Sequence, residues 1–121
     1  MTFTAKEYIL FTRDTAKLAE FYARAFGFKI AKSPHYKETE WLELRAGRGF
    51  KVCLHRFPAP GSPKGNRNKL VLAVRDVGAA REHLVARGVK MGKHHQWPSG
   101  DACDGRDPDG NAFQIAGPPT G

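Results

Sequence analysis

The sequence has no long apolar run, few cysteines and fewer acidic than basic residues. No segment approaches the roughly 20 consecutive apolar residues that a membrane-spanning helix needs. The opening MTFTAKEYIL lacks the basic and apolar regions of a secretory signal. We therefore expect a cytoplasmic protein with no membrane partner. Its two cysteines, Cys53 and Cys103, are too few for a disulfide framework, and we expect both to be reduced thiols.

The charge balance is strongly basic, with 20 Lys and Arg against 12 Asp and Glu and a formal net charge of +8. Such a surface attracts anions and disfavours cationic ligands. The basic residues are spread along the chain without dense clusters or zinc-finger spacings, which argues against a specific nucleic-acid partner. A length of 121 residues suits a single compact domain.

Two segments of the chain have the same design. ILFTRDTAKLAEFYARAFGFKI (9–30) and LVLAVRDVGAAREHLVARGVKM (70–91) each predict an apolar strand, an amphipathic helix and a glycine that ends the helix. Asp14 and Asp76 are suited to cap the two helices at their N-termini. Spacings of three and four predict a buried stripe on each helix, formed by Leu18, Phe21, Tyr22 and Ala25 in the first and by Ala80, Leu84 and Val85 in the second.

A second pair of corresponding segments follows the helices. EWLELRAGRGFKVCLHR and DACDGRDPDGNAFQIAG each predict two strands joined by a glycine-containing turn. Each half therefore predicts a strand, a helix and two or three further strands, which is an α+β fold. RFPAPGSPKGNRNK, rich in proline and glycine, predicts a surface linker between the halves, and GKHHQWPSG predicts a loop that holds His94 and His95.

This duplicated order, with FYARAFGF, VRDVGAAREHLVARGV and the closing DPDGNAFQI, resembles the vicinal oxygen chelate superfamily of glyoxalase I, bleomycin-resistance proteins and extradiol dioxygenases. The resemblance implies two tandem βαβββ modules that form a curled, cup-shaped mixed sheet with helices on the outer side. Module one would cover about 5–56, the linker about 57–68 and module two about 69–117, all within one domain. It also implies a homodimer.

The same resemblance assigns four positions to metal ligands in the family's metal enzymes, and here they hold Glu7, Cys53, Lys69 and Gln114. An ammonium group has no lone pair to give to a metal ion. We therefore expect no metal and no other cofactor, with Lys69 paired to Glu7 and Gln114 beside them. A weak metal site formed by Glu7, Gln114 and either Cys53 or His55 is the alternative.

Alternation along the strands extends the set of residues that face the cup. Phe11 shares the parity of Glu7, His55 that of Cys53, and Trp41 lies on the neighbouring strand with Cys103 at its repeat equivalent. Aromatic walls with a few polar groups suit a planar small molecule. The expected ligand-binding residues are Glu7, Phe11, Trp41, Cys53, His55, Lys69, Cys103 and Gln114.

Three functions are consistent with this pattern. The first is a binding or sequestration protein for an anionic or neutral aromatic compound, in the manner of drug-resistance members of the superfamily. The second is a metal-dependent lyase, isomerase or dioxygenase, and a metal-free enzyme that uses Lys69, Glu7 or His55 is a variant of it. The third is a non-catalytic interaction module with a filled cup. We favour the first.

Overall fold

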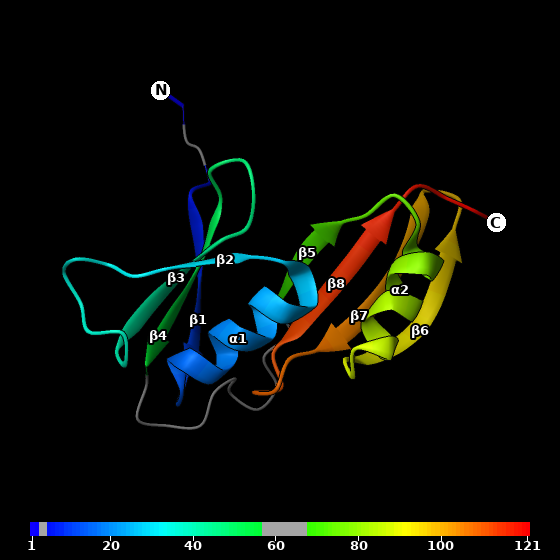
Figure 1. The fold of residues 1–121 in the computed structure, drawn as a ribbon. Helices are drawn as coiled ribbons and strands as arrows, with labels where there is room; N and C mark the ends of the chain where they lie inside the picture. The colour runs from blue at the N-terminus through cyan, green and yellow to red at the C-terminus, as the bar shows by residue number, and fades with distance from the viewer. Residues whose placement is uncertain (3–4, 57–67) are drawn as a thin grey trace. The chain divides into compact units, whose positions relative to one another are not determined.

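The computed structural model of the chain describes residues 1–2, 5–56 and 68–121 and contains two similar halves (Figure 1). The chain divides into two compact units, Met1–Pro63 and Lys64–Gly121. We call the helix and strands of the first unit module one and those of the second module two. The predicted linker lies outside the described residues except for Asn68, and the organisation as a single domain stays a prediction. No helix of the described residues is long and apolar enough to span a membrane.

Each module contains one helix and four strands. In module one these are β1 (Glu7–Thr12), α1 (Thr15–Phe26), β2 (Lys29–Ala31), β3 (Trp41–Arg45) and β4 (Lys51–Arg56). In module two they are β5 (Lys69–Ala73), α2 (Val77–Ala86), β6 (Lys90–Trp97), β7 (Gly100–Arg106) and β8 (Ala112–Gly117).

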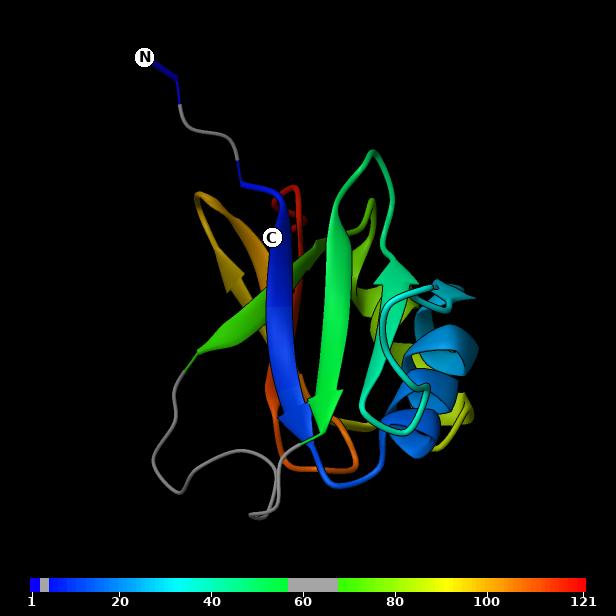
Figure 2. The same ribbon diagram turned by 90° about the vertical axis from the view of Figure 1, so that its left-hand side faces the viewer.

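The two sheets have the same topology. The strand order is β1-β4-β3-β2 in module one and β5-β8-β7-β6 in module two. The first strand of each module runs parallel to the last, and the other neighbours are antiparallel. Figure 2 shows β1 in blue beside β4 in green, pointing in the same direction. These sheets confirm the α+β class and the repeated βαβββ order. The predicted cup needs both sheets together and stays a prediction.

The first helix begins and ends as its sequence predicts. The side chain of Asp14 accepts a hydrogen bond from the backbone N–H of Lys17 at 3.0 Å, and Gly27 ends the helix in the left-handed conformation with φ of 73°. The predicted stripe is confirmed, because Leu18, Phe21, Tyr22 and Ala25 are all buried. This stripe packs on β3 and β4, where each fully buried large apolar side chain contributes roughly 1.5–3 kcal/mol.

The second helix has a narrower buried line than predicted. Asp76 caps it through the backbone N–H of Ala79 at 3.0 Å, and Gly88 follows with φ of 80°. Val77 and Leu84, two turns apart, are buried. Val85 was predicted to be in the core, but its side chain is 47% exposed because the line through Val77 and Leu84 turns it toward solvent.

Alternation along the strands gives each sheet two distinct faces. In module one, one face packs under α1 and consists of buried residues: Leu10, Thr12, Leu42, Leu44, Val52 and Leu54. The opposite face carries no helix of its own module. We call it the helix-free face of module one, formed by Glu7, Ile9, Phe11, Trp41, Glu43, Arg45, Lys51, Cys53 and His55.

Candidate functional site

The helix-free face of module one carries a row of aromatic rings at one end. Strand register aligns Phe11 with His55 and His55 with Trp41 across β1, β4 and β3. The ring centroids of Phe11 and His55 are 5.5 Å apart, and those of His55 and Trp41 are 5.6 Å apart. Tyr36, from the segment before β3, places its ring 5.7 Å from that of Trp41. Phe11 is 45% exposed and Tyr36 60% exposed, so the cluster presents aromatic surface to solvent.

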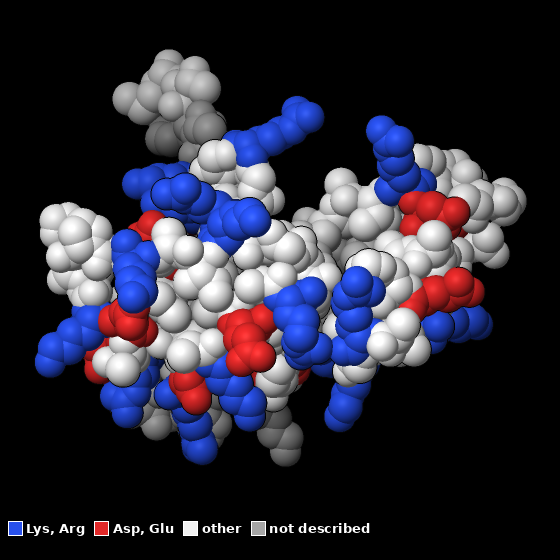
Figure 3. Space-filling model, viewed as in Figure 1, with Lys and Arg blue, Asp and Glu red and all other residues white. Residues whose placement is uncertain are grey.

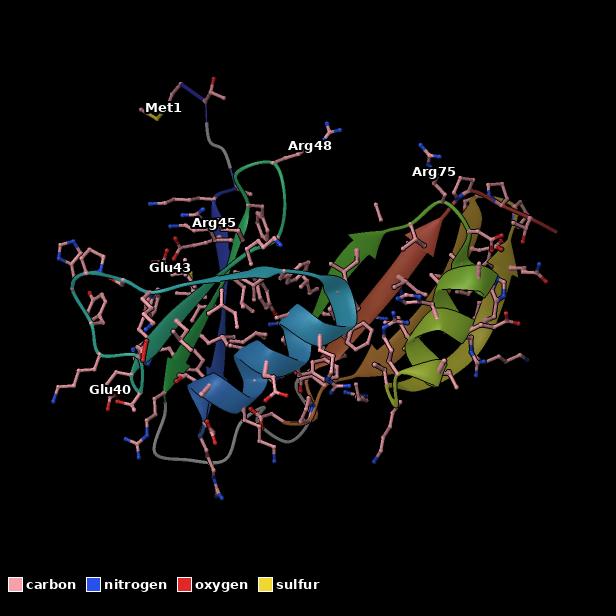
Figure 4. The ribbon with its side chains drawn as sticks, viewed as in Figure 1. Met1, Glu40, Glu43, Arg45, Arg48 and Arg75 are labelled. Carbon is pink, nitrogen blue, oxygen red and sulfur yellow. The ribbon has the colours of Figure 1, made fainter. Side chains whose placement is uncertain are left out.

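A carboxylate holds Trp41 in place on this face. The indole Nε1 of Trp41 donates to Glu43 Oε2 at 3.1 Å, and Lys51 Nζ donates to Glu43 Oε1 at 3.3 Å. The hydrogen bond from Trp41 lowers the pKa of Glu43 below its ordinary value, and Lys51 adds to this effect while burial opposes it. Glu43 and Arg45 lie along β3 between Glu40 and the turn that carries Arg48 (Figure 4).

Cys53 lies in the middle of the same face, next to Ile9 and Glu43 in the register, and is fully buried. Burial raises the pKa of its thiol to about 11, and the negative charges of Glu7 and Glu43 add to the shift. The thiol is therefore protonated at neutral pH. It is therefore a weak nucleophile.

Module two places Lys69 and Gln114 around a carboxylate that the sequence interpretation missed. Lys69 Nζ donates to Asp104 Oδ2 at 2.9 Å, and Gln114 Nε2 donates to Asp104 Oδ1 at 2.9 Å. Burial opposes the ionisation of Asp104, but the hydrogen bonds from Lys69 and Gln114 hold its pKa below the ordinary value. We call these three residues the Lys69–Asp104–Gln114 cluster.

Glu43 and Asp104 occupy equivalent positions in the two modules. Glu43 pairs with Cys53 in the β3–β4 register, and Asp104 pairs with Gln114 in the β7–β8 register. Since Gln114 was already predicted to be the repeat equivalent of Cys53, counting back along the second hairpin from that position would have found Asp104.

The predicted position of Cys103 is wrong. Cys103 pairs with Ile115 and lies buried on the face that packs against α2, where its Sγ donates to the carbonyl oxygen of Gly92 at 3.3 Å. The offset between equivalent residues is one residue shorter in the last two strands than in the first, so Trp41 corresponds to Ala102. A shift of one residue moves a strand side chain to the opposite face.

The two adjacent histidines lie on β6 and not in the predicted loop. His94 Nε2 lies 2.9 Å from Asp101 Oδ2, and Asp101 also accepts hydrogen bonds from the hydroxyl and backbone N–H of Thr120. The His95 ring stacks on Trp97 at 5.0 Å. The side chains of His94 and His95 therefore have different partners.

The donor chemistry at the four predicted positions does not fit a divalent metal ion. Lys69 presents an ammonium, which has no lone pair to give to a metal ion and is bonded to Asp104. Within the ranges that the structure describes, no group of three or more His, Cys, Asp and Glu is arranged to hold a metal. The predicted pairing of Lys69 with Glu7 joins different modules and stays a prediction, whereas Asp104 is a partner of Lys69 within module two.

Comparison with known proteins identifies the family. The model of the glyoxalase-like domain family matches residues 7–116, so the chain belongs to this family, which confirms the superfamily expected from the sequence. No curated protein matches the sequence.

Solved structures share the fold over nearly the whole chain. TnmS3, an antibiotic binding protein from Streptomyces sp. CB03234, is 26% identical with a TM-score of 0.78 and covers 98% of both chains. A glyoxalase/bleomycin resistance protein from the same strain is 26% identical with a TM-score of 0.71, covering 93% of this chain and 98% of that chain. The fosfomycin resistance protein FosX from Listeria monocytogenes, at 17% identity and a TM-score of 0.78, covers 98% of this chain and 92% of its own, and shows likeness of fold alone.

Proposed function

We propose that the protein binds a planar aromatic small molecule, neutral or anionic, on the helix-free face of module one and does so without a metal. The observation that carries this proposal is the exposed cluster of Phe11, His55, Trp41 and Tyr36. A flat ligand that stacks on such rings gains roughly 0.5–1.5 kcal/mol for each ring pair beyond the area it buries.

The helix-free face of module one carries two acidic residues, Glu7 and Glu43, and two basic ones, Arg45 and Lys51. Arg45 and Lys51 form a row with Glu7, four residues along the strands from the aromatic row and thus about 13 Å from it. Glu43, which is bonded to Trp41 and Lys51, lies closer to the rings than these cations do, so the preference for a ligand that is not cationic rests on the net charge of the chain. In Figure 3, blue basic side chains are scattered over the visible face with fewer red acidic ones between them, in keeping with the net charge of +8.

The protonated thiol of Cys53 favours ligand binding over a reaction that needs a thiolate nucleophile. His55 Nδ1 lies 2.7 Å from the carbonyl oxygen of Arg56, and because that oxygen only accepts, Nδ1 carries the proton and the ring is held in place. TnmS3, which shares 26% identity, is described as an antibiotic binding protein. By analogy with TnmS3, we propose that the protein sequesters its ligand or confers resistance to it.

The alternative is a metal-dependent lyase, isomerase or dioxygenase. It would need Glu7, Gln114 and either Cys53 or His55 as ligands. Adding Mn(II), Ni(II), Zn(II) or Fe(II) to purified protein and measuring bound metal by elemental analysis separates the two functions. Metal near one equivalent that disappears in the Glu7→Ala and Gln114→Ala variants would overturn the metal-free proposal.

A single-tryptophan titration tests the binding proposal directly. The chain has two tryptophans, so Trp97→Phe leaves Trp41 as the only one, and Trp41→Phe is the matched control. We expect a library of neutral and anionic aromatic compounds to include ligands that quench the fluorescence of Trp41 with saturation. Quenching confined to the variant that retains Trp97, or no saturable binding by calorimetry, would contradict the proposal.

Two further properties belong to the proposal. We infer a homodimer from the family resemblance, and sedimentation equilibrium at several concentrations would reveal it. A cytoplasmic location stays a prediction, which cell fractionation with the native start of the chain would test.

A further inference from the structure

The Lys69–Asp104–Gln114 cluster leaves one donor group and one acceptor group without a partner among the residues that the structure describes. Asp104 receives one hydrogen bond on each carboxylate oxygen, from Lys69 on Oδ2 and from Gln114 on Oδ1. The ammonium of Lys69 has three N–H groups, and only one bond is made by them within the described residues. Gln114 uses its nitrogen toward Asp104, so its carbonyl oxygen Oε1 remains an acceptor.

Asp104 determines which way these groups point. A carboxylate accepts and cannot donate, so the amide of Gln114 must turn its nitrogen toward Asp104 and its oxygen away. The same carboxylate draws the ammonium of Lys69 across β8 at Ala112, the residue paired with Lys69 in the parallel register. A small side chain at that position lets the lysine pass. The result is a donor and an acceptor that flank one carboxylate.

The row of residues beside the Lys69–Asp104–Gln114 cluster in module two consists of alanines. Ala73, Ala116 and Ala102 are aligned across β5, β8 and β7, one row along from Val71, Gln114 and Asp104. Val71 is 56% exposed. Ala102 is buried, so the accessible apolar surface beside the polar cluster consists of Ala73, Ala116 and Val71.

We infer that the Lys69–Asp104–Gln114 cluster recognises the primary carboxamide or lactam edge of a planar ligand. The carbonyl oxygen of the ligand accepts from Lys69 Nζ, and its neighbouring N–H donates to Gln114 Oε1. The ring to which the amide is attached lies toward the alanine row. The inference rests on the proposed function in that it assumes a small-molecule ligand, and it adds the chemical group that module two reads.

Charge and hydrogen-bond polarity argue against other functional groups on the ligand. A carboxylate would accept from Lys69 but would face the carbonyl oxygen of Gln114 and the charge of Asp104. An amine or guanidinium would meet the positive charges of Lys69 and Arg106, both of which act on Asp104. A ketone satisfies Lys69 and leaves Gln114 Oε1 unpaired, which costs binding energy once water is excluded. An edge with an acceptor and a donor side by side satisfies both.

Calorimetry with matched naphthalene probes tests the inference. The probes are 2-naphthamide, N,N-dimethyl-2-naphthamide, which retains the acceptor and loses the donor, and 2-naphthoate. We expect the wild-type protein to bind 2-naphthamide about tenfold more tightly than either of the other two, the effect of one satisfied hydrogen bond. In Gln114→Leu the ratio of the two amide affinities should fall to about one, because the acceptor is gone.

Matched controls separate this role from general destabilisation. Gln96→Leu makes the same substitution on β6, where the glutamine bonds to Thr120 outside the cluster, and should keep the wild-type ratio. Asp104→Asn should weaken the binding of both amides, because Lys69 loses the carboxylate that positions it, and should also reduce the ratio by misorienting Gln114. Circular dichroism and thermal unfolding of each variant establish that it is folded.

The outcomes are distinct from those of the proposed function. Equal affinity of the wild-type protein for the two amides, a ratio that survives Gln114→Leu, or no binding of any probe would overturn the inference. Should the two amides bind equally and lose affinity in Trp41→Ala, the aromatic site of module one would stand and the amide-reading role of module two would not.

Discussion

The two modules share a backbone plan and differ in the row of side chains at one end of the sheet. Module one has Phe11, His55 and Trp41 across its first, last and third strands. In module two the equivalent positions hold Ala73, Ala116 and Ala102. The two modules thus place side chains at equivalent positions, but the residues at those positions differ in chemistry. One module presents aromatic rings, and the other has small alanine side chains beside a polar cluster.

A carboxylate at the centre of each sheet is what the modules have in common. Glu43 and Asp104 each accept from one ammonium and one neutral N–H group, which are Lys51 and Trp41 in module one and Lys69 and Gln114 in module two. The carboxylates therefore orient the neighbouring groups that would contact a ligand. The neutral partner, an indole in one case and an amide in the other, sets the chemistry of each face.

The largest effects should come from the cores, which are alike. Leu18→Ala on α1 and Leu84→Ala on α2 remove side chains that are 1% and 3% exposed, and each should lower the free energy of unfolding by about 2–5 kcal/mol. Val85→Ala should change it by less than about 0.5 kcal/mol because that side chain is largely exposed. Urea denaturation measures all three. A large loss in Val85→Ala would contradict the narrow buried line of α2.

The cysteines of the two modules should differ in reactivity. Burial raises the pKa of both thiols; Glu7 and Glu43 raise that of Cys53 further, whereas Arg81 acts in the opposite direction on Cys103. With a pKa of about 11 instead of 9.0, Cys53 has about one hundredth of the ordinary thiolate at pH 8. We expect a disulfide reagent to modify Cys53 more slowly than Cys103 in the native protein, as mass spectrometry of peptides would show. Faster labelling of Cys53 would contradict its assigned surroundings.

Replacing the aromatic row by alanine should make module one resemble module two. Phe11→Ala combined with Trp41→Ala should weaken the binding of aromatic ligands identified by the fluorescence titration about thirtyfold or more, the effect of losing ring contacts at a buried interface. Trp97→Ala in module two removes an exposed ring that lies outside the aromatic row and serves as the control. Calorimetry provides the affinities. Equal losses in both variants would remove the distinction between the two rows.

The smallest effect concerns the two carboxylates at acid pH. The pKa of Glu43 in the folded protein lies below its ordinary value of 4.5. Its ionised form therefore stabilises the fold above about pH 4.5, and that contribution disappears as the pH falls through the lowered pKa. Glu43→Gln should flatten the loss of stability between about pH 5 and pH 3 by less than about 1 kcal/mol.

The contribution of Asp104 to stability should also be lost as the pH falls. It should be smaller than that of Glu43, because the side chain of Asp104 is 53% exposed and that of Glu43 is 23% exposed. Unfolding in urea at several pH values, with Asp104→Asn for comparison, measures both contributions. A steeper acid loss in either variant than in the wild type would contradict the assigned interactions.

Local patterns were sufficient to predict most of the fold. The caps at Asp14 and Asp76 and the buried stripe of α1 depend on neighbours within a few residues along the chain, and alternation separates the two faces of β1, β3 and β4. The same alternation predicted that Phe11, His55 and Trp41 face one side, whereas the register that aligns His55 with Trp41 came from the structure. Their role in binding a ligand stays a prediction.

The face on which a strand residue lies depends on the register between strands, and only the tertiary structure revealed that register. The one-residue change of offset in module two places Cys103 under α2 and Ala102 opposite Trp41, and counting along the sequence alone did not reveal it. The partners of side chains also depended on the folded structure. Asp104 on β7 and Lys69 on β5 are far apart in the chain, and they come within hydrogen-bond distance because both strands pair with β8. Sequence by itself determined the repeated βαβββ plan because turns, caps and periodicity are local. The position of Asp104 follows from counting back along its hairpin from Gln114, but its hydrogen bonds with Lys69 and Gln114 required the folded sheet because they join residues on different strands.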